Sequence, residues 1–339
     1  MRLKGRNAVN SYQYISIFLA LFIVTFFVSF IIGRYPIDII SLLRIFLSRL
    51  FPMSKTWNCT IEAIIFQIRL PRILGAALVG ASLSISGAVY QGMFKNPLVS
   101  PDILGASAGA AFGASLAIYL SLNTIGIQLS AFIFGVVGVM MVYLISLRIN
   151  EDPLISLVII GILVGSIFTS FTSLIKYLAD TKDKLPSITF WLMGSLSSIK
   201  LRDIKAIFLP IAMGIGPLYA LRWKLNILSL GEDEAKTMGL DTGKIRAIVI
   251  ICSTLLTATS VSISGVIGWI GLVIPNLSRI LVGPDYRILL PVSILLGGSY
   301  LLLVDNIARS IITVEIPLGI LTSLIGAPFF VFLLLNRGS

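Results

Sequence analysis

Long runs of apolar residues, separated by short polar segments, recur along the whole 339-residue chain. Each run is close to the roughly 20 residues that an α-helix needs to cross the hydrocarbon core of a bilayer. The pattern therefore predicts an all-α integral membrane protein. We place about ten transmembrane helices at 14–33, 72–93, 103–121, 127–148, 154–178, 206–221, 246–264, 266–282, 288–308 and 316–335.

The clearest polar exception is Leu228–Gly243. Gly231 can start a short helix, Glu232 and its acidic neighbours suit the first turn, and Gly239 can end the helix in a left-handed turn. So polar a segment cannot lie in lipid. We expect a short helix in water beside the membrane, within a loop of residues 222–245, where it contacts another protein.

Composition supports a membrane protein and excludes several other classes. Hydrophobic residues make up 57% of the chain and charged residues only 12%, against about 25% charged residues in soluble domains. The net charge of +11 fits lysines and arginines beside anionic lipid better than a nucleic-acid partner. The chain has no histidine and only two cysteines, so we expect neither histidine-based catalysis nor a metal site.

The distribution of basic residues predicts the orientation. Arg2, Lys4 and Arg6 place the amino terminus in the cytoplasm. Ten spans return the carboxyl terminus to the same side, and the basic loop 222–245 also falls there. The segment 34–72 is rich in arginine although it would be external, which suggests that external arginines have a use.

Two similar stretches predict an internal repeat. Ser82–Gly87 reappears as Ser260–Gly265, 178 positions later, and at the same offset Pro97 meets Pro275. The copies lie in the second and seventh spans, an odd number (five) apart, so the repeat halves, about 69–200 and 246–335, would have opposite orientations in a single transmembrane domain of residues 1–339. Inverted repeats are typical of transporters, whose pathway lies at the repeat interface.

The sequence lacks the chemistry of an enzyme. Residues 239–244 resemble a phosphate-binding loop, but the spacing is one residue short and Ile245 stands where a magnesium-binding Ser or Thr is needed. Asp305 is the one carboxylate that we place inside a span, and Arg309, four residues later, can pair with it. An ion-coupled transporter that works alone remains the alternative to a transporter powered by a partner.

Several motifs together resemble the FecCD-type permeases of binding-protein-dependent ABC importers for iron–siderophores, haem and cobalamin. They cover residues 62–335: Arg69-Leu-Pro-Arg72, Ser86-Gly87, Asn96-Pro-Leu98, Pro101-Asp-Ile-Leu-Gly105, Leu230-Gly-Glu232 with Ala235 and Gly239, Gly271-Leu-Val-Ile-Pro275, Glu315-Ile-Pro-Leu-Gly319 and Gly326-Ala-Pro328. The family usually has histidine directly after the proline of the Gly271-Leu-Val-Ile-Pro275 motif, where this chain has Asn276. Asparagine keeps a hydrogen bond but cannot titrate.

The resemblance implies roles for particular residues. The segment 230–240 matches the cytoplasmic coupling helix that docks in the ATPase subunit; its candidate contact residues are Gly231, Glu232, Ala235, Lys236, Met238 and Gly239. Arg69, Arg72 and Arg309 match external arginines that receive glutamates of the substrate-binding protein. Asn96, Leu98 and Pro153, in and near the turn 150–156, match a gate at the cytoplasmic mouth of the pathway.

Taken together, these expectations describe the permease subunit of an ABC importer in the bacterial cytoplasmic (inner) membrane, with both termini in the cytoplasm. It would pair with a second permease subunit, two ATPase subunits and an external substrate-binding protein. The chain itself would bind no cofactor, because ATP and magnesium belong to the ATPases. The resemblance favours a ferric siderophore as cargo, with haem or cobalamin as alternatives.

Overall fold

All the regular secondary structure in the part of the chain that the structure describes is helical. This computed structural model describes residues 10–49, 51, 55, 57–149, 152–311 and 314–335. In chain order the helices are α1 (Asn10–Ile31), α2 (Ile39–Leu47), α3 (Cys59–Ala63), η1 (Ile64–Arg69), α4 (Leu70–Met93), η2 (Pro101–Leu104), α5 (Ala106–Tyr119), α6 (Thr124–Ser146), α7 (Pro153–Leu178), α8 (Lys184–Leu192), α9 (Leu201–Ala220), α10 (Arg222–Leu230), α11 (Glu232–Thr237), α12 (Thr242–Ser264), α13 (Ile270–Val282), α14 (Tyr286–Ser310) and α15 (Leu318–Leu335).

The predicted class, an all-α membrane protein, is confirmed. Seven described helices are long and apolar enough to cross a bilayer: α1, the continuous helix Cys59–Met93, α6, α7, α9, α12 and α14. Helices α5, α13 and α15 contribute three shorter apolar segments. Each predicted span falls on one of these helices, so the number of crossings depends on how the three shorter ones sit in the bilayer.

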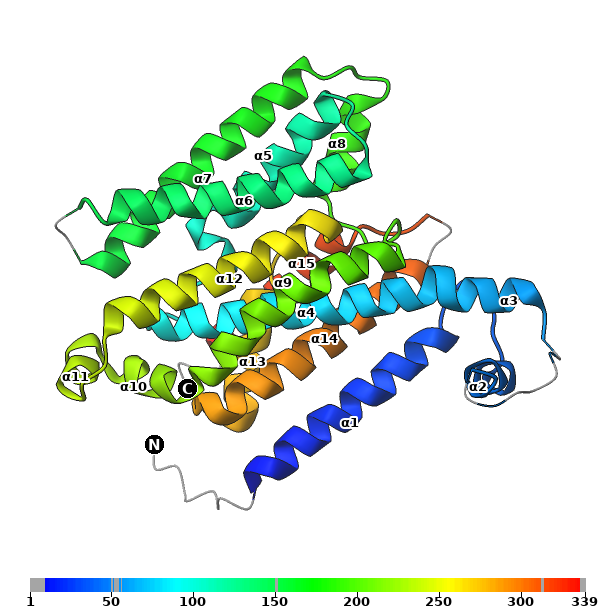
Figure 1. The fold of residues 1–339 in the computed structure, drawn as a ribbon, viewed down its shortest axis with the longest axis horizontal. Coiled ribbons are helices and arrows are strands. Elements are labelled where there is room, and N and C mark those ends of the chain that lie inside the picture. The colour runs from blue at the N-terminus through cyan, green and yellow to red at the C-terminus, as the bar shows by residue number, and fades with distance from the viewer. Residues whose placement is uncertain are drawn as a thin grey trace.

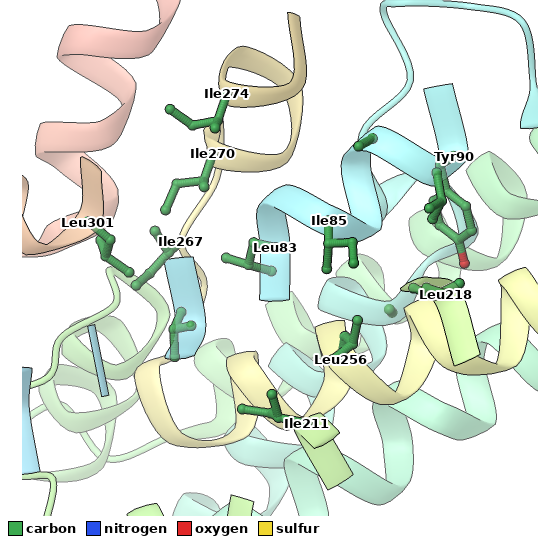
Figure 2. Packing of buried hydrophobic residues seen from close by; sticks show 14 of the residues in the cluster. Leu83, Ile85, Tyr90, Ile211, Leu218, Leu256, Ile267, Ile270, Ile274 and Leu301 are labelled. Carbon is green, nitrogen blue, oxygen red and sulfur yellow. The ribbon is translucent and has the colours of Figure 1, made fainter. Parts of the chain in front are cut away.

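Helix α4 forms the centre of the bundle. It lies among α9, α12, α13 and α14, while α5, α6, α7 and α8 form a group on one side and α1 lies on the outside (Figure 1). Figure 2 shows Leu83, Ile85 and Tyr90 of α4 among apolar side chains of α9, α12 and α13. In the most apolar stretch of the helix Cys59–Met93, 89% of the residues are buried. A helix that is apolar and buried on all sides lies in the middle of a bundle.

Small residues allow the helices around α4 to approach closely. A Cβ atom on Gly80 would collide with the backbone of Gly297 in α14, and one on Gly87 would collide with the backbone of Gly271 in α13. Backbone contact of this kind holds membrane helices together where lipid provides no hydrophobic driving force. Glycine is therefore required at these crossings.

The bundle has two distinct ends. At one, which we call the α11 end, lie α10 and α11, the start of α1, the end of α4 and the starts of α7 and α14; at the other, the α2 end, lie α2 and α3 (Figure 1). Arg2, Lys4, Arg6, Asn150 and the carboxyl-terminal residues 336–339 lie outside the described residues. The cytoplasmic orientation of the α11 end stays a prediction.

The two stretches paired in the predicted internal repeat lie at different places in their helices. Ser82–Gly87 lies inside α4, whereas Ser260–Gly265 ends α12, and Gly265 takes a positive φ of 67°. Helix lengths suggest another register, since the long–short–long series α4, α5, α6 recurs in α12, α13, α14 with starts 172, 164 and 162 residues apart. The spacing changes because the connections differ in length, so one fixed offset cannot align both copies.

Candidate transport and coupling site

The predicted start and end of the short polar helix are confirmed. Helix α11 spans Glu232–Thr237, after Gly231 in an extended conformation (φ 166°). Gly239 adopts a φ of 79°, its N–H bonds to the Lys236 carbonyl, and the Leu240 N–H bonds to the Ala235 carbonyl. These two bonds form the glycine-dependent motif that closes a helix C-terminus.

Glu232 fastens α11 to the start of α12. Its carboxylate accepts a hydrogen bond from Arg246 Nη2 at 2.6 Å and another from Thr242 Oγ1 at 3.2 Å, both on α12. Lys236, one turn away on α11, lies 3.3 Å from the same carboxylate. Charge-assisted bonds of this length are the stronger class. A displacement of α11 would therefore pull on α12.

Ala235 of α11 and Met238, which follows the helix, do not form a single contact face; the prediction that both face a partner is corrected. Ala235 is 0% exposed and belongs to the apolar core, whereas Met238 is 60% exposed. Leu230, just before α11, is 66% exposed. The surface available to a partner therefore carries Leu230, Met238 and the exposed side chain of Lys236, while Ala235 and Glu232 hold the helix from behind.

Helix α10 was not expected from the sequence, because the basic residues Arg222 and Lys224 resemble a loop. Leu225 and Leu228, three residues apart, are buried and explain why this stretch is helical. Asn226 of α10 donates to the Asp285 carboxylate at 2.8 Å and accepts from the Tyr286 N–H at 2.8 Å. Helix α10 is thereby anchored to the start of α14.

The charge on Asp285 keeps this anchor in place at ordinary pH. Burial opposes ionisation, but hydrogen bonds from Arg287 and Asn226 outweigh it and lower the pKa of Asp285 from 3.8 to about 2. Because the pKa of Asp285 is lower in the folded state, its ionised carboxylate stabilises the fold fully at pH values above its ordinary pKa of 3.8. This stabilisation is lost as the pH falls through about 2.

The predicted gate residues lie close together at the α11 end. Asn96 Oδ1 accepts a hydrogen bond from the Leu98 N–H at 2.9 Å, which fixes the turn after α4, and both residues are exposed. A cavity of about 230 Å³ separates this turn from α7; Asn96 and Val99 line one side, and Leu154, Ile155, Val158 and Ile159 line the other.

Pro153 is the first residue of α7, and the Asp152 carboxylate accepts a hydrogen bond from the Leu154 N–H at 2.7 Å. The structure thus brings Asn96 beside the first turns of α7, and the gate role itself stays a prediction.

Two further contacts join the turn Lys95–Val99, here called the gate turn, to neighbouring helices. Lys95 Nζ donates to the carbonyl of Leu230, the last residue of α10, at 3.1 Å. Asn276 Nδ2 donates to the Pro97 carbonyl at 2.8 Å and to the Leu272 carbonyl at 2.8 Å. Asn276, which replaces the usual histidine, therefore links α13 to the gate turn with a neutral amide. The sequence analysis missed Lys95, although its position directly before the Asn96–Leu98 motif could have drawn attention to it.

Two of the three arginines predicted for docking are used to hold α1. Arg69 donates to the carbonyls of Phe30 and Tyr35, and to that of Ile31 at 3.2 Å. Arg309 donates to the Ser29 carbonyl. The last carbonyls of a helix lack intrahelical partners, so both guanidinium groups satisfy the C-terminal end of α1. Both side chains are buried, not presented on the surface.

The third arginine, Arg72, forms the centre of a buried ion-pair network. Its Nε lies 2.8 Å from Asp305 Oδ1, and its Nη1 lies 2.9 Å from Glu315. Arg309 Nε is farther from Asp305, at 3.7 Å. The main partner of Asp305 is therefore Arg72 on another helix, and not Arg309 one turn away as the sequence suggested.

A carboxylate that the sequence analysis did not consider lines an open cavity on the side of the helix bundle. Asp102 lies on η2 and accepts a hydrogen bond from Ser107. The cavity, about 450 Å³, lies between η2 with α5 and α7, and its lining includes Asp102, Gly105, Gly161, Gly165, Ser166, Thr169 and Ser170. Asp102 was missed because the predicted span began at residue 103, although the residue belongs to a motif that had been singled out.

Comparison with known proteins assigns the chain to a family. The model of the FecCD transport family matches residues 21–336. The chain belongs to the FecCD transport family. The molybdate import system permease protein MolB of Haemophilus influenzae is 43% identical over 94% of both chains. A probable iron chelatin transport system permease of Helicobacter pylori is 40% identical over 81% of this chain and 83% of its own length.

A solved structure agrees with the fold of this FecCD protein. An inward-facing metal-chelate type ABC transporter superposes with a TM-score of 0.86, 41% identity, and coverage of 96% of this chain and 99% of that chain. The resemblance drawn from the sequence motifs is thereby confirmed. In this FecCD chain residues 230–240 and the turn Lys95–Val99, for which coupling and gating roles are predicted, lie with their connecting bonds at one end of the bundle.

Proposed function

We propose that the chain is the permease subunit of an ABC importer, working with a second permease subunit, two ATPase subunits and an external substrate-binding protein. The observation that carries this proposal is the arrangement of α11. It presents an exposed surface at one end of the bundle and is fastened from behind to α12 through Glu232 and Arg246. A helix held in this way can receive a push from a partner and pass it to the membrane helices.

The route of the push is continuous in the described residues. Movement of α11 acts on α12 through the Glu232–Arg246 pair, and movement of α10 acts on the gate turn through Lys95 and the Leu230 carbonyl. Rigid helices that rock about tightly packed crossings switch access between the two sides of a membrane. ATP hydrolysis on the partner would supply the energy, and the chain itself would bind no cofactor.

The ATPase contact is tested by affinity purification of the full chain in mild detergent. Leu230→Ser combined with Met238→Ser should reduce the recovered ATPase several-fold, because exposed apolar side chains at a soluble end are typical anchors of protein interfaces. Leu147→Ser, at an equally exposed leucine beyond α6, is the matched control and should leave recovery unchanged. Full recovery of the ATPase with the double variant would reject this contact surface.

The substrate-binding protein would dock at the α2 end. Exposed Arg49 and Lys55, which both contact Glu62, offer accessible positive charge there. Arg69, Arg72 and Arg309 remain candidates, but partner glutamates would have to displace the carbonyl and carboxylate groups that now occupy them. A docking surface centred on Arg49 is therefore the simpler proposal. Arg49→Glu should weaken binding-protein affinity at low salt; equal affinity would exclude Arg49.

A ferric siderophore is the proposed cargo, on the strength of the motif resemblance and the Helicobacter pylori relative. Molybdate is the second candidate, favoured by the Haemophilus influenzae relative, which matches nearly the whole chain. Uptake assays with labelled ferric chelates, molybdate, haem and cobalamin would separate them. Uptake of molybdate alone would overturn the siderophore proposal and leave the importer proposal intact.

An ion-coupled carrier working alone is the alternative mechanism. Cells depleted of ATP but holding a proton gradient should lose uptake, whereas cells treated with an uncoupler and supplied with ATP should keep it. The opposite pattern would exclude an ABC importer. A permease of this kind would lie in the bacterial cytoplasmic membrane with the α11 end in the cytoplasm.

A further inference from the structure

The cavity beside Asp102 is an open hollow on the side of the helix bundle, and Asp102 and the α7 residues Ser166, Thr169 and Ser170 that line it are exposed. Gly161 and Gly165, which line it, are the ninth and thirteenth of the 26 residues of α7. At about 1.5 Å per residue they lie roughly 12–18 Å from the start of a helix about 39 Å long. The carboxylate therefore sits near the middle of a membrane-spanning helix, where an ionisable group is costly unless it serves a function.

The polar groups of the cavity are almost all hydrogen-bond acceptors. Ser166 donates its proton to the Ile162 carbonyl at 2.9 Å, Thr169 to Gly165 at 2.8 Å and Ser170 to Ser166 at 2.9 Å. A hydroxyl group that donates to its own helix keeps its oxygen lone pairs for another partner. Together with the Asp102 carboxylate, the cavity offers negative potential and acceptors but few donors.

Helix α7 has two different exposed faces. Ser166, Thr169, Ser170 and Ser173, three or four residues apart, form a hydroxyl face, whereas Leu163, Ile167, Phe171 and Leu174 form an apolar face. The apolar face suits lipid. The hydroxyl face adjoins the cavity that holds Asp102, and a carboxylate facing hydrocarbon would be strongly unfavourable. The hydroxyl face and the cavity are therefore on a water-filled side.

We propose that Asp102 and the hydroxyl face of α7 form a transit site in the transport pathway, which takes cationic or hydrogen-bond-donating groups of the cargo. Such groups are an ammonium, a hydrated cation or an amide N–H. Donors on the ligand would meet acceptors of the protein, and the single carboxylate provides one unit of charge, enough to hold such a group briefly. This proposal rests on the transport function above and specifies where and how cargo touches the chain.

Thiol accessibility tests the site without knowledge of the cargo. Cys59→Ser and Cys252→Ser remove the two native thiols, and Ser166→Cys then places a single thiol beside Asp102. The purified full chain in detergent or nanodiscs is treated with cationic trimethylammonium-ethyl and anionic sulfonatoethyl methanethiosulfonate. Each rate is divided by the rate of the same reagent with a free thiol. Leu163→Cys, on the apolar face, is the matched control.

The cationic reagent should react with Ser166→Cys at least about fivefold faster than the anionic one, because a nearby carboxylate attracts one and repels the other. Adding Asp102→Asn should bring the ratio to about one, and Asp102→Glu should retain it. Leu163→Cys should react with neither reagent. If Asp102→Asn does not fold, the ratio with the native Asp102 and with Asp102→Glu still decides.

Three results would overturn the proposal. One is a ratio that Asp102→Asn leaves unchanged. Another is labelling of Ser166→Cys only by a lipid-soluble maleimide, which would place the hydroxyl face in lipid. The third is efficient cross-linking between two copies through Ser166→Cys, which would make this face a permease interface. Because these assays need no ATPase, failure of the chain to bind an ATPase would reject the importer proposal separately.

Discussion

Among single residues, Arg72 has the most demanding surroundings. It is 6% exposed and lies between Asp305, which is 1% exposed, and Glu315, which is partly open to solvent. An isolated buried charge is far more costly than a buried pair, so each partner depends on the other. The network holds α4, α14 and the segment before α15 together at the α2 end.

Arg72→Met should therefore destabilise the protein by about 3–5 kcal/mol, because the buried Asp305 carboxyl group would lose its nearest charge partner and keep only the more distant Arg309 beside it. Thermal unfolding in detergent measures the loss. Arg72→Met combined with Asp305→Asn should recover a large part of it, since the uncompensated charge is then gone. A double variant no more stable than Arg72→Met alone would show that the pair does not act as a unit.

The sequence predicts local features of residues better than their partners. Gly231 and Gly239 were recognised as helix ends because that role depends on the glycines themselves and their neighbours. The partners of Arg69 are carbonyls more than 30 residues earlier in the chain, so no local pattern could show that its guanidinium group is engaged inside the protein. The same holds for Arg72, whose partners lie 233 and 243 residues away.

Among the elements, α11 is a short helix that depends on its attachments. Six residues form too little helix to be stable alone. Its support comes from Ala235 in the core and from Glu232 bound to Arg246, whose side chain is mostly buried. The nearby Lys244–Asp241 pair is exposed and contributes little.

Arg246→Met should weaken the attachment of α11 to α12 by roughly 1–3 kcal/mol, because a charge-assisted bond is lost and Glu232 is left partly buried. Hydrogen–deuterium exchange of a peptide covering residues 232–240 should become about tenfold faster. Lys244→Met removes a neighbouring positive charge without touching Glu232 and should leave the exchange unchanged. Equal protection in both variants would show that the pair does not hold α11.

The positions of the helices were predicted well where runs of apolar residues determine them. Every predicted span falls on a helix, because runs of apolar residues are a property of the chain alone. Helix α10 was missed because its stability comes from Leu225, Leu228 and the Asn226–Asp285 contact, which need α14 in place. The cavity at Asp102 was missed for a similar reason, since α7 completes it.

At the scale of the whole molecule, two hydrogen bonds join the gate turn to helices that are distant in the sequence. Lys95 joins it to α10, and Asn276 joins it to α13. Coupling between sites needs an element that both can bias, and under the proposed function this turn would be that element. The proposed ATPase contact and the proposed gate are then separated by a single hydrogen bond.

Lys95→Met should reduce the cargo transported per ATP hydrolysed at least about threefold, since α10 would move without pulling the turn. ATP hydrolysis by the reconstituted complex should stay near normal because α11 is untouched. Lys224→Met, which removes the same charge from α10, is the control and should transport normally. Parallel loss of hydrolysis and transport in Lys95→Met would instead indicate a general folding defect.

The continuous helix Cys59–Met93 has a mechanical consequence. Its 35 residues extend about 52 Å, well beyond the roughly 30 Å of a bilayer core. It carries Arg72 towards the α2 end and leads directly into Lys95 at the α11 end, so one stiff rod joins the two surfaces where partners are proposed to dock. A tilt of about 5° about its crossings at Gly80 and Gly87 would displace the Cys59 end by about 3 Å and the Met93 end by about 1 Å in the opposite direction. The rod would thus act as a lever whose fulcrum is the set of glycine crossings at Gly80 and Gly87.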